Sequence, residues 1–217
     1  QNFSLTSDYY NIRIEDRIVF SENFTGGVVA DLLRPFGASG GRYFTNAIDT
    51  RTEGVDVIAR YAFRIGEHST TRLTVGYNNT DTRVIRVKKT PAQLAAFQET
   101  LFGRVERGRI SEAQPNSNVN LTANYNWRDL GVMARTIRFG RVTNRTPSAA
   151  NDQVFEAKWI TDLDLSYRLF GALGVAVGAN NVFDVYPEQN ILANSTSGIL
   201  IYSGRSPFGF NGRYVYA

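Results

Sequence analysis

Apolar and polar residues alternate over several long stretches of this chain. In residues 118–127 every odd position is apolar or aromatic, and every even position is Asn or Thr. A similar alternation runs through residues 159–169, and a softer one through residues 55–63, where Ile58 and Ala62 interrupt it. A period of two residues predicts β-strands that have one apolar face and one polar face.

The length of these runs favours strands that cross a membrane. They are about 9 to 11 residues long, which is the length a tilted strand needs to cross a bilayer, whereas strands of soluble proteins more often have about 5 to 6 residues. Near the start, the apolar positions change phase before Tyr10, which indicates a bulge or an over-long strand. Weaker alternation predicts further strands in residues 3–14, 71–79, 130–141, 173–183 and 208–216. The prediction is an all-β antiparallel meander of about eight strands.

The connections between these strands are short and long in turn. Residues 65–70, 128–129 and 170–172 are tight connections, and residues 21–49, 88–116, 143–156 and 184–200 are long ones. Short turns on one rim and long loops on the other are typical of bacterial outer-membrane barrels. Strands that run toward the short-turn rim should end in interfacial aromatic residues. They do so in all three cases, with Tyr61 and Phe63, with Tyr125 and Trp127, and with Tyr167 followed by Phe170.

We therefore predict that the apolar side of each strand contacts lipid. The side chains predicted to face the membrane are Val55, Val57, Tyr61, Phe63, Leu73, Val75, Tyr77, Val119, Leu121, Tyr125, Trp127, Leu163, Leu165, Tyr167, Val175, Val177, Phe210, Tyr214 and Tyr216. The opposite side should line a water-filled interior. There we expect Arg13, Arg60, Arg72 and Arg168 to pair with Asp56, Asp162 and Asp164.

Composition agrees with strands and not with membrane helices. Hydrophobic residues make up 42% of the chain, and no stretch approaches the roughly 20 consecutive apolar residues of a spanning helix. The mean hydropathy of −0.26 is compatible with a membrane barrel, because each strand is apolar on one side only. The net charge is +4, but the arginines are spread among acidic and polar residues, so we predict no nucleic-acid partner.

The candidate catalytic and metal-binding residues are few. The absence of cysteine excludes disulfides and thiolate sites, and the single histidine, His68, excludes a multi-histidine metal site. His68 falls on the rim opposite Ser206, which disfavours a Ser/His/Asp arrangement. Asp162 and Asp164 share one strand face and are interpreted as polar lining rather than a glycosidase pair. We predict no enzyme activity, no catalytic residue, no metal and no cofactor, and the ligand-binding residues stay unknown.

The long connections carry fewer signals. Thr90 before Pro91 predicts a helix start, and Leu94, Phe97 and Leu101 at helical spacing predict a short helix over residues 91–102, with its apolar face packed. The pairs Gly26-Gly27 and Gly40-Gly41 lack a strand-to-helix context, so they are interpreted as flexible loop residues. In residues 180–184, Asn and Asp side chains are expected to satisfy backbone groups as a strand leaves the sheet.

Five segments resemble the C-terminal barrel of TonB-dependent receptors. They are DYYNIRIEDRIVFSENF (8–24), TRTEGVDV (50–57), WITDLDLSYRL (159–169), LGVAVGANNVFDVYPEQN (173–190) and SPFGFNGRYVYA (206–217), in the family's order. The resemblance implies a 22-stranded outer-membrane barrel plugged by an N-terminal domain. It also implies import of a scarce small-molecule nutrient, often a ferric siderophore, driven by the TonB complex. The implied partners are outer-membrane lipid, the plug domain, the other barrel strands, the TonB complex and the nutrient.

These 217 residues depart from the family pattern in ways that shape our expectation. They contain no plug domain, no TonB box and no signal peptide, and the terminal aromatic residue of the family's last strand is missing. We expect residues 1–217 to be the C-terminal portion of such a barrel, truncated at both ends. Two alternatives stay open: a complete eight-stranded outer-membrane barrel acting as an anchor or adhesin, and a soluble β-sandwich or lipocalin-like binder.

Overall fold

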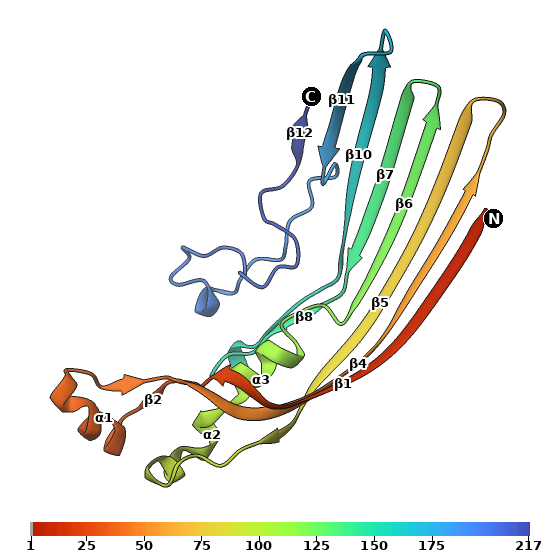
Figure 1. Cartoon of the computed structure of the whole chain (residues 1–217). Coiled ribbons are helices and arrows are strands. Elements are labelled where there is room, and N and C mark those ends of the chain that lie inside the picture. Colours follow the sequence, from red (N-terminus) through yellow and green to blue (C-terminus); the bar gives the residue numbers. More distant parts are fainter. Residues whose placement is uncertain (1) are drawn as a thin grey trace.

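The computed structural model describes residues 2–217, which form one long antiparallel sheet of eight strands (Figure 1). Each main strand pairs with the next one along the chain, so the predicted meander is confirmed. Within the described residues, β1 and β12 lie at the two edges and do not pair, and the sheet is open rather than closed into a barrel. The strands in order are β1 (Phe3–Phe20), β4 (Phe44–Phe63), β5 (Ser69–Val87), β6 (Ser117–Trp127), β7 (Leu130–Phe139), β10 (Lys158–Leu169), β11 (Leu173–Asn180) and β12 (Tyr214–Tyr216).

Several strand bounds differ from the prediction. β1, β4 and β5 have 18, 20 and 19 residues, because they continue past the alternating region into the loops. The register shifts of β1 fall between Ile14 and Ile18, so β1 is over-long, and its bulge is not at Tyr10. β12 contains only three residues, and Phe208 and Phe210 lie before it, outside the sheet.

The three predicted tight turns are present and lie together at one end of the sheet (Figure 1). They comprise residues 64–68, 128–129 and 170–172, and we call this end the turn end. His68, Arg128 and Phe170 adopt positive φ angles of 63°, 50° and 52°. A residue in the left-handed region reverses the chain within a few residues, which explains how such short connections join long strands.

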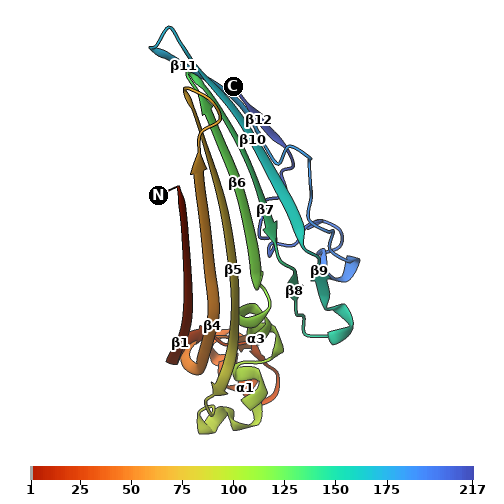
Figure 2. The ribbon, with the colours of Figure 1, turned by 90° about the vertical axis from the view of Figure 1, so that its right-hand side faces the viewer.

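The four long connections gather at the opposite end of the sheet, in what we call the loop layer (Figures 1 and 2). They comprise residues 21–43, 88–116, 140–157 and 181–213. Among residues 2–217, no helix is long and apolar enough to cross a membrane. The loop layer contains the helices α1 (Gly27–Leu33), α2 (Gln98–Leu101) and α3 (Arg104–Ser111), the 3-10 turns η1 (Arg34–Phe36), η2 (Ala92–Phe97), η3 (Ala149–Asn151) and η4 (Leu192–Asn194), and the short strands β2 (Phe24–Thr25), β3 (Gly40–Gly41), β8 (Val142–Asn144) and β9 (Gln153–Phe155).

The main buried apolar cluster belongs to the loop layer and the strand ends below it. Its members are Val19, Phe24, Val29, Ala47, Ile48, Leu101 and Phe102. Leu94 and Phe97 pack against this cluster, so the apolar side chains of the second long connection are packed, as predicted. Burial of these side chains against the first long connection joins the two loops.

Local details of these two loops were predicted incorrectly. In place of one helix over residues 91–102, the 3-10 turn η2, which is kinked at Leu94, is followed by the single-turn helix α2. Thr90 does not cap a helix; its N–H donates to Gln98 Oε1 at 2.8 Å. Gly26 precedes helix α1, and Gly40–Gly41 forms strand β3 against β2, so these glycines belong to ordered elements.

Candidate functional site

The cross-strand register sorts the side chains of the sheet into two faces. Residues directly opposite one another on neighbouring strands point to the same face. One such row runs Val57, Tyr77 and Val119 from β4 to β6. The face that carries this row is called the apolar face. Sixteen of the predicted membrane-facing residues lie on it: Val55, Val57, Tyr61, Phe63, Leu73, Val75, Tyr77, Val119, Leu121, Tyr125, Trp127, Leu163, Leu165, Tyr167, Val175 and Val177.

The apolar face is not covered by any other part of the described chain. Figure 2 shows the sheet as a single curved layer. On β10 and β11, Leu165 and Val177 are 46% and 47% exposed, whereas Ser166 between the apolar positions of β10 is half-buried. Sheets of soluble proteins bury the apolar side instead. This arrangement contradicts a soluble sandwich, in which these side chains would be enclosed.

The last three residues of the predicted lipid-facing set lie elsewhere. Tyr214 and Tyr216 are opposite Asn180 and Gly178, on the polar face, and it is Val215 that shares the apolar face. The Tyr216 hydroxyl donates to Asp164 Oδ2 at 2.9 Å. The prediction failed for these two because a Tyr-Val-Tyr strand has no polar position from which to read the phase.

Phe210 also differs from the prediction. It lies in the loop layer, and its ring stacks on Tyr202 with 6.0 Å between the ring centroids. Phe210 therefore does not belong to the face of any strand. Its even-numbered spacing to Tyr214 carried the prediction, but the chain between them is not extended as a strand.

Two tyrosines of the polar face lie over glycines of the neighbouring strand. Tyr10 is opposite Gly54, and Tyr216 is opposite Gly178. A Cβ atom built on Gly54 would lie 2.3 Å from the Tyr10 ring, and one on Gly178 would lie 2.4 Å from the Tyr216 hydroxyl. Only glycine leaves room for the ring to lie flat across the strand, which explains how Tyr10 is accommodated on the polar face; Ile12 and Ile14, which follow it on this face, are opposite threonines instead.

The apolar face is bounded at both ends. From Trp159 to Tyr167, strand β10 extends about 26 Å, similar to the ~25 Å apolar band of outer-membrane barrels. Toward the loop layer, the same face becomes charged on β1, β4 and β5, where Arg51 pairs with Glu53 at 2.7 Å. Arg13 is opposite Arg51 in this charged belt, so the prediction that Arg13 lines the polar interior is wrong.

The ion pairs of the polar face also differ from the prediction. Arg60, Arg72 and Arg168 lie on this face, but the ion pair of Asp162 is with Arg135, at 2.6 Å. Asp162 is 6% exposed and also accepts the N–H of Asn181 at 2.8 Å. Asp56 instead accepts the Asn78 side chain at 2.6 Å, and Asp164 accepts the Tyr216 hydroxyl. The buried Asp162 thus fixes the chain where β11 ends.

Residues 180–184 have the structural role that was predicted for them. The Asn181 side chain donates to the Val185 carbonyl at 2.8 Å and accepts the Val185 N–H at 3.0 Å. Asp184 Oδ1 accepts the N–H of Arg213 at 2.8 Å. Asn181 and Asp184 both have positive φ, of 50° and 57°. These contacts hold the segment before β12 against the end of β11.

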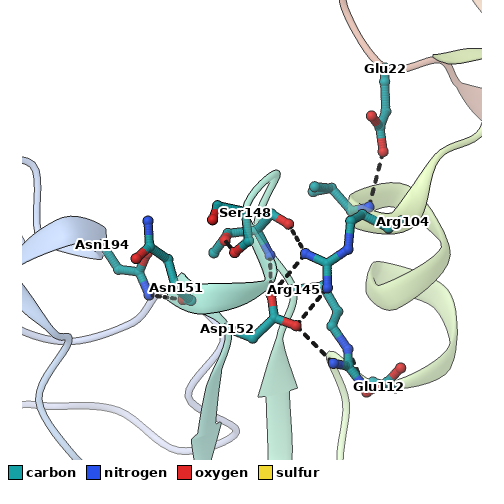
Figure 3. A network of polar contacts seen from close by, with 10 residues as sticks. Glu22, Arg104, Glu112, Arg145, Ser148, Asn151, Asp152 and Asn194 are labelled. Atoms are coloured by element: carbon teal, nitrogen blue, oxygen red, sulfur yellow. Dashed lines mark hydrogen bonds and ion pairs between the residues drawn. The ribbon is translucent and has the colours of Figure 1, made fainter.

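Asp152 joins the second and third long connections (Figure 3). Arg104 of α3 contacts both of its carboxylate oxygens, at 2.9 and 2.7 Å, and Arg145 binds it at 2.8 Å. The Arg104 guanidinium, then the Thr146 N–H and the Arg145 guanidinium, hold the pKa of Asp152 well below its usual range. Arg145 also pairs with Glu112 at 2.8 Å. No local sequence pattern predicts this network, because Arg104 and Asp152 are 48 positions apart.

Further contacts connect the other two long connections to this network. Glu22 accepts the N–H of Val105 at 3.0 Å, so a carboxylate from the first connection caps α3 of the second (Figure 3). Asn194 of the fourth connection donates to the Asn151 carbonyl of the third at 2.9 Å. The loop layer is therefore one connected body of four segments.

A cavity of about 520 Å³ lies between the polar face and the loop layer, and we call it the loop cavity. Its floor is the polar face of β5 and β6, and its sides come from the end of α3 and from two loop segments. Among residues 2–217, no cluster of His, Asp or Glu is suited to hold a metal ion. The residues that line the loop cavity are Asn78, Thr80, Thr82, Ile110, Ser111, Ala113, Gln114, Pro115, Asn116, Asn118, Gly204, Arg205, Ser206 and Pro207.

Comparison with known families agrees with this geometry. The family described as TonB dependent receptor-like, beta-barrel, matches residues 1–182. This chain belongs to the TonB-dependent receptor β-barrel family. A search of curated proteins finds no match.

Solved TonB-dependent receptors and outer-membrane transporters have a similar fold. The ferripyoverdine receptor of the outer membrane of Pseudomonas aeruginosa is 16% identical with a TM-score of 0.54, over 86% of this chain and 22% of that one. The FrpB iron transporter from Neisseria meningitidis is 16% identical with a TM-score of 0.56, over 85% and 25%. The outer membrane transporter YddB from Escherichia coli is 11% identical with a TM-score of 0.57, over 87% and 27%. The chain thus spans about a quarter of the length of these proteins.

Proposed function

We propose that this chain forms part of the wall of an outer-membrane TonB-dependent transporter, with its apolar face in lipid. The observation that carries this proposal is the uncovered apolar face, bounded by aromatic residues and by a charged belt. Exposed apolar surfaces of this extent mark contact with a membrane or a partner. Along the apolar face, β4 to β7 pair with a neighbour on each side, so their backbone groups are satisfied there without water, whereas β11 pairs with β12 only over Gly178–Asn180.

The orientation follows from the two ends of the sheet. Outer-membrane barrels have short turns at the periplasm and long loops outside. The turn end therefore faces the periplasm, and the loop layer faces the cell exterior. The polar face lines the interior, and the loop cavity opens within the outer half of the wall.

The whole protein would bind a scarce nutrient outside the cell and import it, with energy supplied through the TonB complex. The chain would supply the C-terminal portion of the barrel, and further strands and an N-terminal plug would complete it. In support, the structurally similar proteins include a receptor bound to ferripyoverdine and an iron transporter, so a ferric siderophore is the proposed class of cargo. The open sheet disfavours the alternative of a complete eight-stranded barrel. We propose a transport function and no enzymatic one.

Single-cysteine labelling in cells tests the membrane placement, because the chain contains no cysteine of its own. Phe36 of the loop layer and Phe170 of the turn end are 81% and 97% exposed. A membrane-impermeant maleimide should label Phe36→Cys in intact cells, and Phe170→Cys only after the outer membrane is permeabilised. Leu165→Cys on the apolar face should resist labelling in both conditions.

Each result bears directly on the proposal. Labelling of Leu165→Cys as fast as Phe36→Cys would mean that the apolar face is in water, and the proposal would fail. Labelling of Phe170→Cys but not of Phe36→Cys in intact cells would mean that the turn end faces the cell exterior, opposite to the proposed orientation. Ser166→Cys is the matched control for Leu165→Cys, since it occupies the next position on the polar face.

A further inference from the structure

The apolar face is hollowed where β5, β6, β7 and β10 lie side by side (Figure 2). This depression has a volume of about 320 Å³, and we call it the wall hollow. Small side chains form its floor, since Ala123 and Ala134 are opposite each other, between Leu73 of β5 and Leu163 of β10. The residues that line the wall hollow are Leu73, Thr74, Val75, Leu121, Thr122, Ala123, Ala134, Arg135, Thr136 and Thr161.

The next row of the wall hollow toward the loop layer is also suited to hydrocarbon. It runs Val75, Leu121, Thr136 and Thr161 from β5 to β10. The Thr161 hydroxyl donates to the Thr136 hydroxyl oxygen at 3.0 Å, so these two polar groups meet each other within the wall. An unfilled hollow forfeits dispersion contacts, which an acyl chain from the bilayer restores. The volume is at the lower limit of small-molecule sites, about 300–1,000 Å³.

An arginine lies on the loop-layer side of the wall hollow. Arg138 is the next apolar-face residue of β7 after Thr136, and it is opposite Val119 and Trp159. Two residues of a strand span about 7 Å, so the half-buried Arg138 lies close to the hollow. Tryptophan is enriched at the membrane interface, and an arginine beside it can extend its charge to the level of the lipid headgroups.

Arg138 differs from the other arginines of the apolar face in having no acidic partner. Within residues 2–217, no ion pair or side-chain hydrogen bond involves Arg138, whereas the three arginines of the charged belt each pair with a carboxylate. These pairs are Arg13 with Glu15, Arg51 with Glu53 and Arg83 with Asp81. A cation on a lipid-facing surface costs free energy unless an anion compensates its charge. A lipid headgroup can supply that anion.

We infer that the wall hollow and Arg138 together bind one phosphorylated, acylated lipid of the outer leaflet, of the lipid A class. One acyl chain would occupy the hollow and a phosphate would bind Arg138, whose guanidinium fork matches phosphate with two parallel hydrogen bonds. Along β7 the hollow lies toward the centre of the apolar face and Arg138 toward the loop layer, which is the order of chain and phosphate in such a lipid. This inference rests on the proposed function, because it requires the apolar face in lipid and the loop layer outside the cell.

Trp159 can report on this site because it is opposite Arg138. The full 217-residue chain with Trp127→Phe, which leaves Trp159 as its one tryptophan, is reconstituted in phosphatidylcholine vesicles with brominated acyl chains. Bromine quenches tryptophan fluorescence on contact. Unbrominated lipid A is then added, and bound lipid A displaces brominated chains. Fluorescence should recover at a mole fraction about tenfold lower than random mixing predicts, which corresponds to about 1.4 kcal/mol.

Four further substitutions make the assignment specific. Arg138→Gln should raise the required mole fraction about tenfold, to the value for random mixing, and Ala134→Leu, which fills the hollow, should raise it several-fold. Arg83→Gln removes the same charge from the same face away from the hollow, and Val132→Leu enlarges an apolar-face residue of β7 outside it. Both controls should leave the response to lipid A unchanged. Circular dichroism establishes that each variant retains its strands.

Several outcomes would overturn the inference. Recovery only at the mole fraction of random mixing would mean that no site exists, and equal losses in Arg138→Gln and Arg83→Gln would indicate general attraction to positive charge. Recovery at a lower mole fraction of phosphatidylglycerol than of lipid A would assign the site to a different lipid. Recovery that follows protein concentration before lipid A is added would assign the hollow to a second copy of the chain.

The same experiment separates this inference from the proposed function. If brominated lipid does not quench Trp159 at all, the apolar face is not in lipid, and both the proposed function and the inference fail. Quenching of Trp159 without a preference for lipid A supports the placement of the sheet in the membrane and overturns only the lipid site.

Discussion

A single arginine on one face of β6 should destabilise the sheet in lipid, and the same residue one position away should not. Leu121 lies on the apolar face and Asn120 on the polar face, with β5 and β7 on either side. The apolar run from Val119 to Trp127 is about 26 Å long, which places Leu121 about 7 Å from its centre at Ala123. Arg at the bilayer midplane costs about 2–4 kcal/mol, falling to about 0–1 kcal/mol at the interfaces. Leu121→Arg should therefore cost about 2 kcal/mol.

The two tryptophans of the chain report on this experiment. Trp127 and Trp159 both lie on the apolar face, near its two ends. The chain is reconstituted in phosphatidylcholine vesicles, and urea unfolding is followed by tryptophan fluorescence. A loss of about 2 kcal/mol lowers the urea midpoint by about 1 M for a slope of about 2 kcal/mol/M. Asn120→Arg should change the midpoint by less than about 0.3 M, as polar-face substitutions remain within about 0.5 kcal/mol.

The reasoning is refuted if the two variants behave alike. Equal shifts would mean that both faces of β6 meet the same solvent. A larger shift for Asn120→Arg than for Leu121→Arg would mean that the polar face is the buried one. Either result would remove the basis for placing the apolar face in lipid.

The remaining predictions concern close contacts, the loop layer and solubility. Gly54→Val should lower the free energy of unfolding by about 1–3 kcal/mol, and with it the urea midpoint, because its Cβ would overlap the Tyr10 ring at 2.3 Å. Gly76→Ala should be tolerated, because the atom nearest to its added Cβ is 3.7 Å away. Asp152→Asn should speed cleavage of the loop layer by an added protease several-fold, and Asp31→Asn, in an exposed ion pair, should not. The folded-state pKa of Asp152 is depressed, so its contribution is present above its unfolded pKa of about 3.9 and is lost as the pH falls through the folded value. Protease protection of the wild type should therefore be the same at pH 7 and pH 5, and a loss between these values would contradict the assignment. Finally, the chain should aggregate in water without detergent, because it has two open sheet edges and an exposed apolar face, and a monodisperse monomer by size-exclusion chromatography would contradict this.

Much of the sheet could be predicted from the sequence because its pattern is local. A strand places successive side chains on opposite faces, so the alternation in residues 118–127 and 159–169 determined which side chains share a face. A shift of one residue would move every side chain of a strand to the other face, which is why the pattern also constrained the register. The short connections could be located for the same reason, since they interrupt the alternation.

The assignment of side chains to a face of the sheet failed where a strand lacks alternating apolar and polar residues. The strand Tyr214–Tyr216 contains no polar residue, so the sequence could not tell that Val215, and not its neighbours, lies on the apolar face. In the long β1 strand, the face of a side chain depends on the partner strand. Tyr10 is on the polar face because Gly54 of the partner strand leaves space for its ring, and no property of β1 alone contains that information.

The sequence by itself determined that this chain is a meander of long strands with one apolar side, because side-chain alternation is a property of neighbouring residues. The tertiary structure decided how the loops come together. The ion pair of Arg104 with Asp152, the capping of α3 by Glu22 and the cavity that contains Arg205 and Asn118 all join segments far apart in the chain. Such contacts depend on charge and shape in three dimensions, and they leave no periodic signal along the chain.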